Sequence, residues 1–106
     1  MRVLIPEDIH SDERRTITQL FTVDIKQVNL FEVQPGVELG NHYHKDTIEY
    51  FYVLEGKLKS NNKIMSAGDL FVYYPQENHK INTITLTKFM TFLTKPFDKL
   101  NPDLHK

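Results

Sequence analysis

The chain is a series of short segments in which hydrophobic and polar residues alternate, separated by turn residues. A period of two is typical of a β-strand with one buried face. The clearest case is the run 26–33, and its faces divide as follows: Val28, Leu30 and Glu32 on one, Gln27, Asn29, Phe31 and Val33 on the other. No segment has sustained helical periodicity, so the pattern predicts an all-β fold.

Strands are predicted at 16–23, 26–33, 41–43, 47–54, 57–60, 63–65, 70–74, 79–84 and 87–94. Asn61-Asn62 is expected to turn a hairpin, because asparagine tolerates positive φ. Residues 3–5 are predicted either as a short strand that pairs across a dimer or as a loosely docked terminus. One helical turn is expected at 98–100, in a polar tail. Roughly nine or ten short strands favour a single antiparallel barrel or jelly roll over residues 1–106.

Two predicted strands carry faces that need an explanation. Gln27 and Asn29 beside Phe31 suit a barrel lumen with polar groups for a ligand, or else a partly exposed edge strand. In the run 47–54, Glu49 shares a face with Phe51 and Val53. The opposite face is too aromatic for water and is expected to pack on a second sheet or a second subunit. That face consists of Ile48, Tyr50, Tyr52 and Leu54.

Composition narrows the possible classes of function. The chain has 106 residues, a net charge of −1 and no cysteine. The charge balance gives no reason to expect a nucleic-acid or membrane partner, and disulfides and thiolate sites are excluded. The opening residues do not resemble a signal peptide, so a cytoplasmic location is expected. A barrel of this size is marginal alone and has edges to cover, which favours a homodimer.

Two histidines stand where a metal site could form. His42 and His44 are two apart, so in an extended strand both imidazoles point to one face. A tight turn after His44 can bring Glu49 back to the same point, and His79 is a candidate fourth ligand. Three imidazoles and one carboxylate suit Fe, Mn, Ni, Co or Zn as a single divalent transition metal. The alternative is a vestigial set that binds no metal.

The run from Gly36 to Gly56 resembles the first motif of the cupin superfamily, with His42, His44 and Glu49 at its fixed positions. Residues 68–83 resemble the second cupin motif more loosely, because Gly68 and His79 fit while other positions differ. Tyr74, Gln76 and Thr83 replace a proline, a glycine and an asparagine. The resemblance implies the cupin double-stranded β-helix, a jelly-roll barrel, and a metal held by His42, His44, Glu49 and His79.

A weaker resemblance lies near the amino terminus. The run from Asp12 to Phe21 is similar to the opening segment of sugar-nucleotide cupins, with Asp12 and Arg14 matching and Arg15 in place of a glycine. Residues 40–44 also resemble a segment of capsular-polysaccharide cupins. A guanidinium suits a nucleotide diphosphate, so Arg14 is a candidate substrate ligand together with Gln27 and Asn29. The alternative for Arg14 is a surface charge pair.

Two residues are candidates for proton transfer. Tyr73 could face the lumen as a general acid, and Glu77 could act as a base on the loop before His79. A packed tyrosine and an ordinary loop carboxylate are the competing interpretations.

Three functions remain open on the sequence. The first is a metal-dependent enzyme that isomerises or epimerises a carbohydrate or a nucleotide-linked sugar, with a small-molecule substrate. The second is an Fe(II)-type dioxygenase acting on a small organic substrate. The third is a non-catalytic sensor that binds a small molecule or sugar. A fold that hosts many functions does not choose among them.

Overall fold

The computed structural model describes residues 1–106 and is built from eleven strands without a helix. The strands are β1 (Arg2–Leu4), β2 (Glu7–Ser11), β3 (Thr16–Gln19), β4 (Gln27–Val33), β5 (Glu38–His42), β6 (Glu49–Glu55), β7 (Lys57–Ser60), β8 (Lys63–Ser66), β9 (Leu70–Tyr73), β10 (His79–Thr83) and β11 (Thr87–Leu93). The predicted all-β class is confirmed. No helix is long and apolar enough to cross a membrane.

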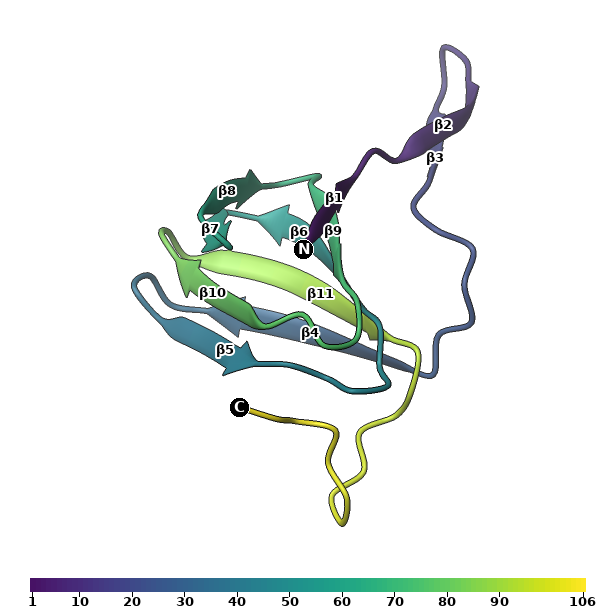
Figure 1. The fold of residues 1–106 in the computed structure, drawn as a ribbon. Coiled ribbons are helices and arrows are strands. Elements are labelled where there is room, and N and C mark those ends of the chain that lie inside the picture. The colour runs from purple at the N-terminus through teal and green to yellow at the C-terminus, as the bar shows by residue number, and fades with distance from the viewer.

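Two antiparallel sheets form the body (Figure 1). One has the order β1-β9-β6-β11-β4, and the other has the order β5-β10-β7-β8. Strands distant in sequence are neighbours: β11 pairs with both β4 and β6, and β10 pairs with both β5 and β7. This exchange of strands between two facing sheets is the jelly-roll arrangement that the sequence predicts.

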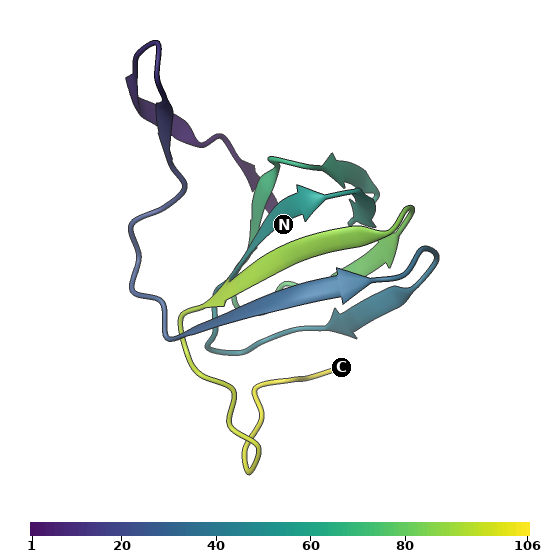
Figure 2. The same ribbon diagram turned by 180° about the vertical axis from the view of Figure 1, so that it is seen from behind.

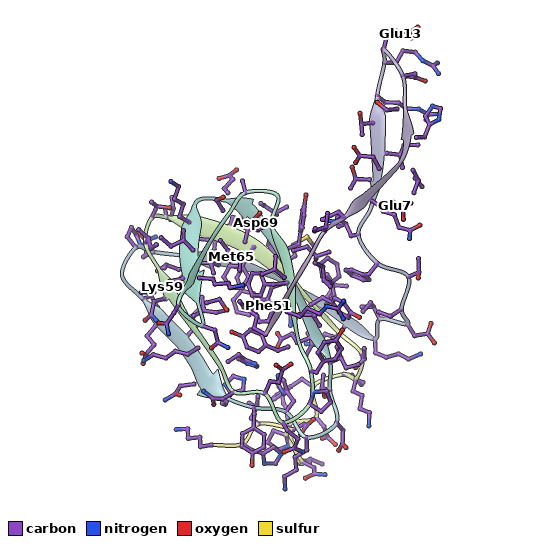
Figure 3. All side chains as sticks on the ribbon, turned by 45° about the horizontal axis from the view of Figure 1, so that its top comes forward. Glu7, Glu13, Phe51, Lys59, Met65 and Asp69 are labelled. Atoms are coloured by element: carbon purple, nitrogen blue, oxygen red, sulfur yellow. The ribbon has the colours of Figure 1, made fainter.

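Aromatic side chains fill the space between the sheets. The rings of Phe31 and Phe89 stack at 4.7 Å, and those of Phe51 and Phe71 at 4.9 Å. Phe51 lies inside the body in Figure 3 and is 3% exposed. The predicted inward face of β6, with Glu49, Phe51 and Val53, is thus confirmed as the interior face.

The amino-terminal region departs from the prediction. Residues 16–23 form only the short strand β3, which pairs with the unpredicted β2 in a hairpin, Glu7–Gln19, called the arm below. The arm projects from the body, with Glu7 at its base and Glu13 at its tip (Figure 3). Every residue of its two strands is exposed, and the hairpin makes a separate two-stranded sheet. Such a hairpin lacks a hydrophobic face to bury within its own chain.

The chain on either side of the arm packs against the five-stranded sheet. β1 pairs with β9 of the same chain, so a short strand is present here, at Arg2–Leu4. Its other edge is free, and the suggested pairing across a dimer stays a prediction. Phe21, expected within a strand, instead stacks on Tyr50 at 4.6 Å and meets Phe92 at 5.0 Å. The outer face of β6 is therefore partly covered by this chain, while Leu54 on the same face stays exposed.

The predicted hairpin turn in the body is present, whereas the helical turn predicted in the tail is absent. Asn61 and Asn62 both have positive φ, at 47° and 66°, as the predicted hairpin turn between β7 and β8 requires. The tail after β11 has no helical turn at 98–100. Leu100 N–H instead donates to the Asp98 carboxylate at 2.9 Å, a local bond that competes with a helical turn. The tail then returns to the body beneath β5 (Figure 2).

One glycine is required by the close approach of two segments. Gly56 has φ +83°, and a Cβ there would lie 2.2 Å from the carbonyl oxygen of Leu86. We expect Gly56→Ala to lower the free energy of unfolding by about 2–5 kcal/mol, from left-handed strain plus a backbone clash. Gly68→Ala is the matched control, because Gly68 has φ +91° with open space around it, and should cost only about 1–2 kcal/mol. Urea unfolding of both variants measures the difference, and equal losses would contradict the clash.

Candidate metal centre

Three separate segments bring four side chains to one end of the interior. His42 ends β5 and is directly opposite His79, the first residue of β10, in the register of the two strands. His44 follows two residues after His42, and Glu49 is the first residue of β6 in the other sheet. The site therefore depends on the two sheets facing each other, and no single hairpin could form it.

A local change of backbone conformation near the end of β5 sets the direction of His42 and His44. Gly40 and Asn41 have φ of +84° and +69°, so two successive residues leave the extended conformation just before His42. A Cβ on Gly40 would lie 2.9 Å from the carbonyl oxygen of His79. Only glycine allows the two strands to approach this closely here, and the register of β10 shifts at the same point.

The three histidines lie against one another, and Glu49 lies against two of them. The ring nitrogens of His42, His44 and His79 all lie within 4.8 Å of one another. The Nε2 atoms of His42 and His79 are 2.7 Å apart. The carboxylate of Glu49 lies 3.0 Å from His44 Nε2 and 3.8 Å from His79 Nε2. The structure thus brings together all four predicted ligands.

Burial controls the protonation of the histidines. His79 is 3% exposed and packs on the ring of Tyr73 at 4.9 Å. Burial, followed by the neighbouring His42 and His44, lowers the pKa of His79 to about 3. Burial is also the main cause that lowers the pKa of His42. For His44 burial is again the largest cause and acts in the same direction. The hydrogen bonds with Glu49 and the Asp103 backbone and the charges of both carboxylates together outweigh it, so the pKa of His44 is raised.

These observations fit a metal. A neutral imidazole at pH 7 offers the lone pair that coordination needs, and the lowered pKa values of His42 and His79 keep both neutral. Adjacent ligands about 2.1 Å from one ion stand about 3.0–3.4 Å apart in octahedral or tetrahedral geometry. The observed separations of 2.7, 3.0 and 3.8 Å bracket that range. The Nδ1 atom of His79 is buried without a hydrogen-bond partner, so the only polar contacts that orient this ring are at Nε2.

A cavity of about 220 Å³ opens beside the cluster. Gln27 and Asn29 line it, as expected for lumen-facing amides, and Gln27 Nε2 donates to Asn29 Oδ1 at 3.1 Å. Most of the remaining wall is apolar. The lining residues are Gln27, Asn29, Phe31, Leu39, Gly40, His42, His44, Glu49, Phe51, His79, Ile81, Phe89, Leu93, Phe97 and Leu104. Its only titratable side chains are the three histidines and Glu49.

The two candidate proton-transfer residues lie elsewhere. Tyr73 is fully buried, and its hydroxyl is hydrogen-bonded to Ser60 at 2.6 Å, away from the cavity. Glu77 accepts hydrogen bonds from the Tyr74 N–H and from the Met1 amino group, at 2.7 and 2.6 Å. Neither lines the cavity, so the sequence-based suggestion that they act on a substrate is corrected: both have structural partners.

Arg14 is also outside the cavity of its own chain. It lies near the tip of the arm, where its guanidinium pairs with Asp12 at 3.1 Å and its side chain is 73% exposed. Within one chain Arg14, a candidate substrate ligand on the sequence, does not line the cavity and forms the surface charge pair given as the alternative.

The tail contributes residues that sequence reasoning missed. Phe97 and Leu104 line the cavity. The Asp103 carbonyl accepts a hydrogen bond from His44 Nδ1 at 2.6 Å. Burial acts to raise the pKa of the Asp103 side chain, but hydrogen bonds from Lys45 and Asp46 outweigh it and hold that pKa far below its usual range. Nothing in the tail's polar composition predicts these contacts, because they depend on where the chain returns after β11.

A two-sheet jelly roll with histidines on two paired strands of one sheet, and a glutamate from the facing sheet, is a cupin-type barrel. The sequence model of the family described as "Cupin domain" matches residues 29–93, and the chain belongs to that family. A search of curated protein sequences found no match.

Solved structures of sugar-modifying proteins share the fold. The capsular polysaccharide assembling protein CapF from Staphylococcus aureus aligns with a TM-score of 0.65 and 22% identity, over 95% of this chain and 34% of that chain. The rmlC epimerase of Mycobacterium tuberculosis aligns with a TM-score of 0.77 and 13% identity, over 93% and 65% of the two chains. The sugar 3,4-ketoisomerase QdtA from Thermoanaerobacterium thermosaccharolyticum, in complex with TDP, aligns with a TM-score of 0.72 and 19% identity, over 96% and 84%. The chain thus spans about a third of CapF and about two thirds of the epimerase.

Proposed function

We propose that this chain is a metal-dependent enzyme that isomerises or epimerises a sugar, with a nucleotide-linked keto sugar as its substrate class. The observation that carries the proposal is a cluster of His42, His44, Glu49 and His79 on one wall of a small cavity that also contains the paired amides of Gln27 and Asn29. The structural neighbours support it, because they include an epimerase and a ketoisomerase of sugars.

The size of the cavity limits how such a substrate would bind. About 220 Å³ is smaller than a typical site for a drug-sized ligand and suits one sugar ring. A nucleotide diphosphate attached to that sugar would extend outside the cavity. The amides of Gln27 and Asn29 would donate to and accept from sugar hydroxyls, while the aromatic and aliphatic wall keeps water away from the reacting carbon.

The four clustered side chains would hold the metal. When bound, a divalent ion would act as a Lewis acid toward the sugar carbonyl. Isomerisation also requires removal of a proton from the carbon next to that carbonyl and its return to the same or the neighbouring carbon. Since no other titratable side chain of this chain lines the cavity, that proton would pass through this cluster or through water held by it.

Proton exchange gives a direct test. The protein would be incubated in D2O with TDP-4-keto-6-deoxyglucose, the ligand of a QdtA structure, and with other nucleotide-linked keto sugars. NMR would follow the incorporation of deuterium at a carbon beside the carbonyl. The proposal is supported if EDTA stops this incorporation and added metal restores it. Glu49→Gln should lose the exchange and His10→Ala, in the arm, should keep it.

Other outcomes separate the alternatives. Exchange that survives complete metal removal would contradict the metal requirement and leave the His44–Glu49 pair as the proton-transfer group. No exchange with any sugar, together with oxygen uptake by the iron-loaded protein, would replace the proposal with a dioxygenase. Saturable sugar binding without exchange would indicate a sensor.

We further propose that the working form is a homodimer joined through the arm. The arm exposes Ile9 and Ile17, at 56% and 38%, and the outward face of β4 exposes Val28 and Leu30, at 49% and 57%. β4 is also one of the two edge strands of the five-stranded sheet, so it can accept another strand. A second copy would supply the surface that each of these features lacks, and only on that copy could Arg14 reach a ligand.

Charges on the arm should disrupt this assembly. We expect sedimentation at micromolar concentration to show a dimer for the unmodified chain and a monomer for the double variant Ile9→Asp, Ile17→Asp, because each buried aspartate costs several kcal/mol. Ile64→Asp is the matched control, since Ile64 is also exposed, at 64%, but lies on β8. A monomeric unmodified chain would remove the dimer and leave the barrel unaffected.

A further inference from the structure

The tail closes one side of the candidate metal centre. After β11 it leaves the sheets and returns beneath β5, as both Figure 1 and Figure 2 show. The backbones of Tyr43 and His105 exchange two hydrogen bonds, at 2.8 and 3.0 Å. The last part of the tail thus pairs with the chain just after β5, next to His42 and His44. Leu104, the residue before His105, lines the cavity.

Asp103 holds this part of the tail in place. Its Oδ1 accepts the backbone N–H of Lys45 at 2.8 Å. Its Oδ2 accepts the N–H groups of Asp46 and Thr47 and the Thr47 hydroxyl, at 2.9, 3.1 and 3.0 Å. Three consecutive N–H groups that converge on one carboxylate form an anion-binding turn. That turn is the connection from His44 to Glu49, two of the candidate ligands.

The main chain of Asp103 acts on His44 itself. Its carbonyl accepts from His44 Nδ1 at 2.6 Å, so Nδ1 keeps its proton and the ring is turned with Nε2 toward the Glu49 carboxylate. A hydrogen bond at the far ring nitrogen is what fixes the tautomer and orientation of a ligating histidine. The side chain of Asp103 therefore anchors the segment whose carbonyl orients the ligand.

We propose that Asp103 is a positioning residue of the metal centre: its carboxylate clamps the 45–47 turn so that its carbonyl sets His44 with Nε2 free to bind metal. This deepens the proposed function and rests on it only for the metal. The orientation of His44 is a property of the metal-free protein and can be measured alone.

The test compares Asp103→Ala with Asp98→Ala, a second aspartate of the tail whose carboxylate accepts only from Leu100 N–H. NMR of the metal-free, 15N-histidine-labelled proteins reports the tautomer of His44, and amide exchange reports residues 45–47. Asp103→Ala should lose the full protonation of His44 Nδ1 and exchange these amides at least about tenfold faster, while Asp98→Ala matches the unmodified protein. Cobalt affinity, by calorimetry, should fall about 10–100-fold in Asp103→Ala alone.

Asp103→Asn keeps the shape of the side chain and one acceptor oxygen. Its amide exchange rates and cobalt affinity should lie between those of Asp103→Ala and the unmodified protein. It also serves if Asp103→Ala does not fold. An unchanged His44 tautomer in Asp103→Ala and Asp103→Asn would overturn the proposal, as would cobalt affinity within twofold of Asp98→Ala despite a changed tautomer. If the unmodified protein binds no cobalt, the metal-dependent function fails, while the tautomer measurement still decides whether Asp103 positions His44.

Discussion

Replacing His79 with alanine is expected to weaken the binding of a divalent transition metal by more than about 100-fold. Residues outside the coordination sphere already account for 10–100-fold when mutated, and a direct ligand contributes more. His79 is also the most buried of the three histidines, so solvent cannot readily substitute for its ring in the same position. Calorimetry with Co²⁺ or Zn²⁺ on protein without a histidine tag measures the loss.

The matched control is His10→Ala. His10 pairs with Asp12 on the arm, half exposed and outside the cluster. The His10→Ala variant should leave the affinity and stoichiometry of metal binding unchanged. Equal affinities for His79→Ala and the unmodified protein would show that metal binds elsewhere and would remove the four-ligand site. His42→Ala and His44→Ala should resemble His79→Ala, since each supplies one nitrogen to the same cluster.

His42, His44 and Glu49 could be predicted from local spacing, whereas the prediction of His79 rests on the looser second motif. The spacing of His42 and His44, and the alternation that places Glu49 with Phe51, are local properties of an extended chain. The same alternation places Gln27 and Asn29 on one face with Phe31 but leaves open a lumen or a partly exposed edge strand; both residues line the cavity, and β4 is an edge strand. A period of two specifies a face wherever one side of the strand is buried.

The arm and the tail could not be predicted because local pattern does not determine their positions. Residues 16–23 have strong strand propensity, yet only the first four pair, and Phe21 serves as a cover for Tyr50. Propensity indicates that such residues suit a half-buried surface but not which surface they meet. Asp103 likewise has an ordinary polar neighbourhood in sequence, and its role arises from a return of the chain across 56–58 positions.

The protonation of the buried histidine leads to the second large effect, on stability against pH in the metal-free protein. Unfolded His79 takes up a proton near its ordinary pKa of 6.5, whereas folded His79 resists it down to about 3. The unfolded state thus binds more protons between these values, and the free energy of unfolding must fall as the pH falls. The limiting slope is about 1.4 kcal/mol per pH unit, which accumulates to roughly 4–5 kcal/mol over the whole window.

The other groups with shifted pKa values determine which pH range should be measured. The lowered pKa of His42 adds to the loss in the same direction. The raised pKa of His44 stabilises the fold below 6.5 and loses that effect only as the pH rises through its folded value, above this window. Asp103, with a lowered pKa, loses its contribution only below its ordinary value of 3.8. Glu77, with a lowered pKa, loses its contribution only as the pH falls toward and below its ordinary value of 4.5. The range from pH 6.5 to about 4.5 therefore reports mainly the two neutral histidines.

Urea unfolding of EDTA-treated protein across this range measures the slope. His79→Gln removes the titrating ring and should reduce the slope by about 1.4 kcal/mol per unit, because glutamine binds no proton in either state. His10→Gln, on the exposed arm, should leave it unchanged. Saturating metal should steepen the loss of stability on acidification, because protons then compete with the ion for the same nitrogens. A flat profile for the unmodified metal-free protein between pH 6.5 and 4.5 would mean that His79 accepts its proton in the folded state, and that its ring is not confined among Phe51, Tyr73 and the other histidines as described.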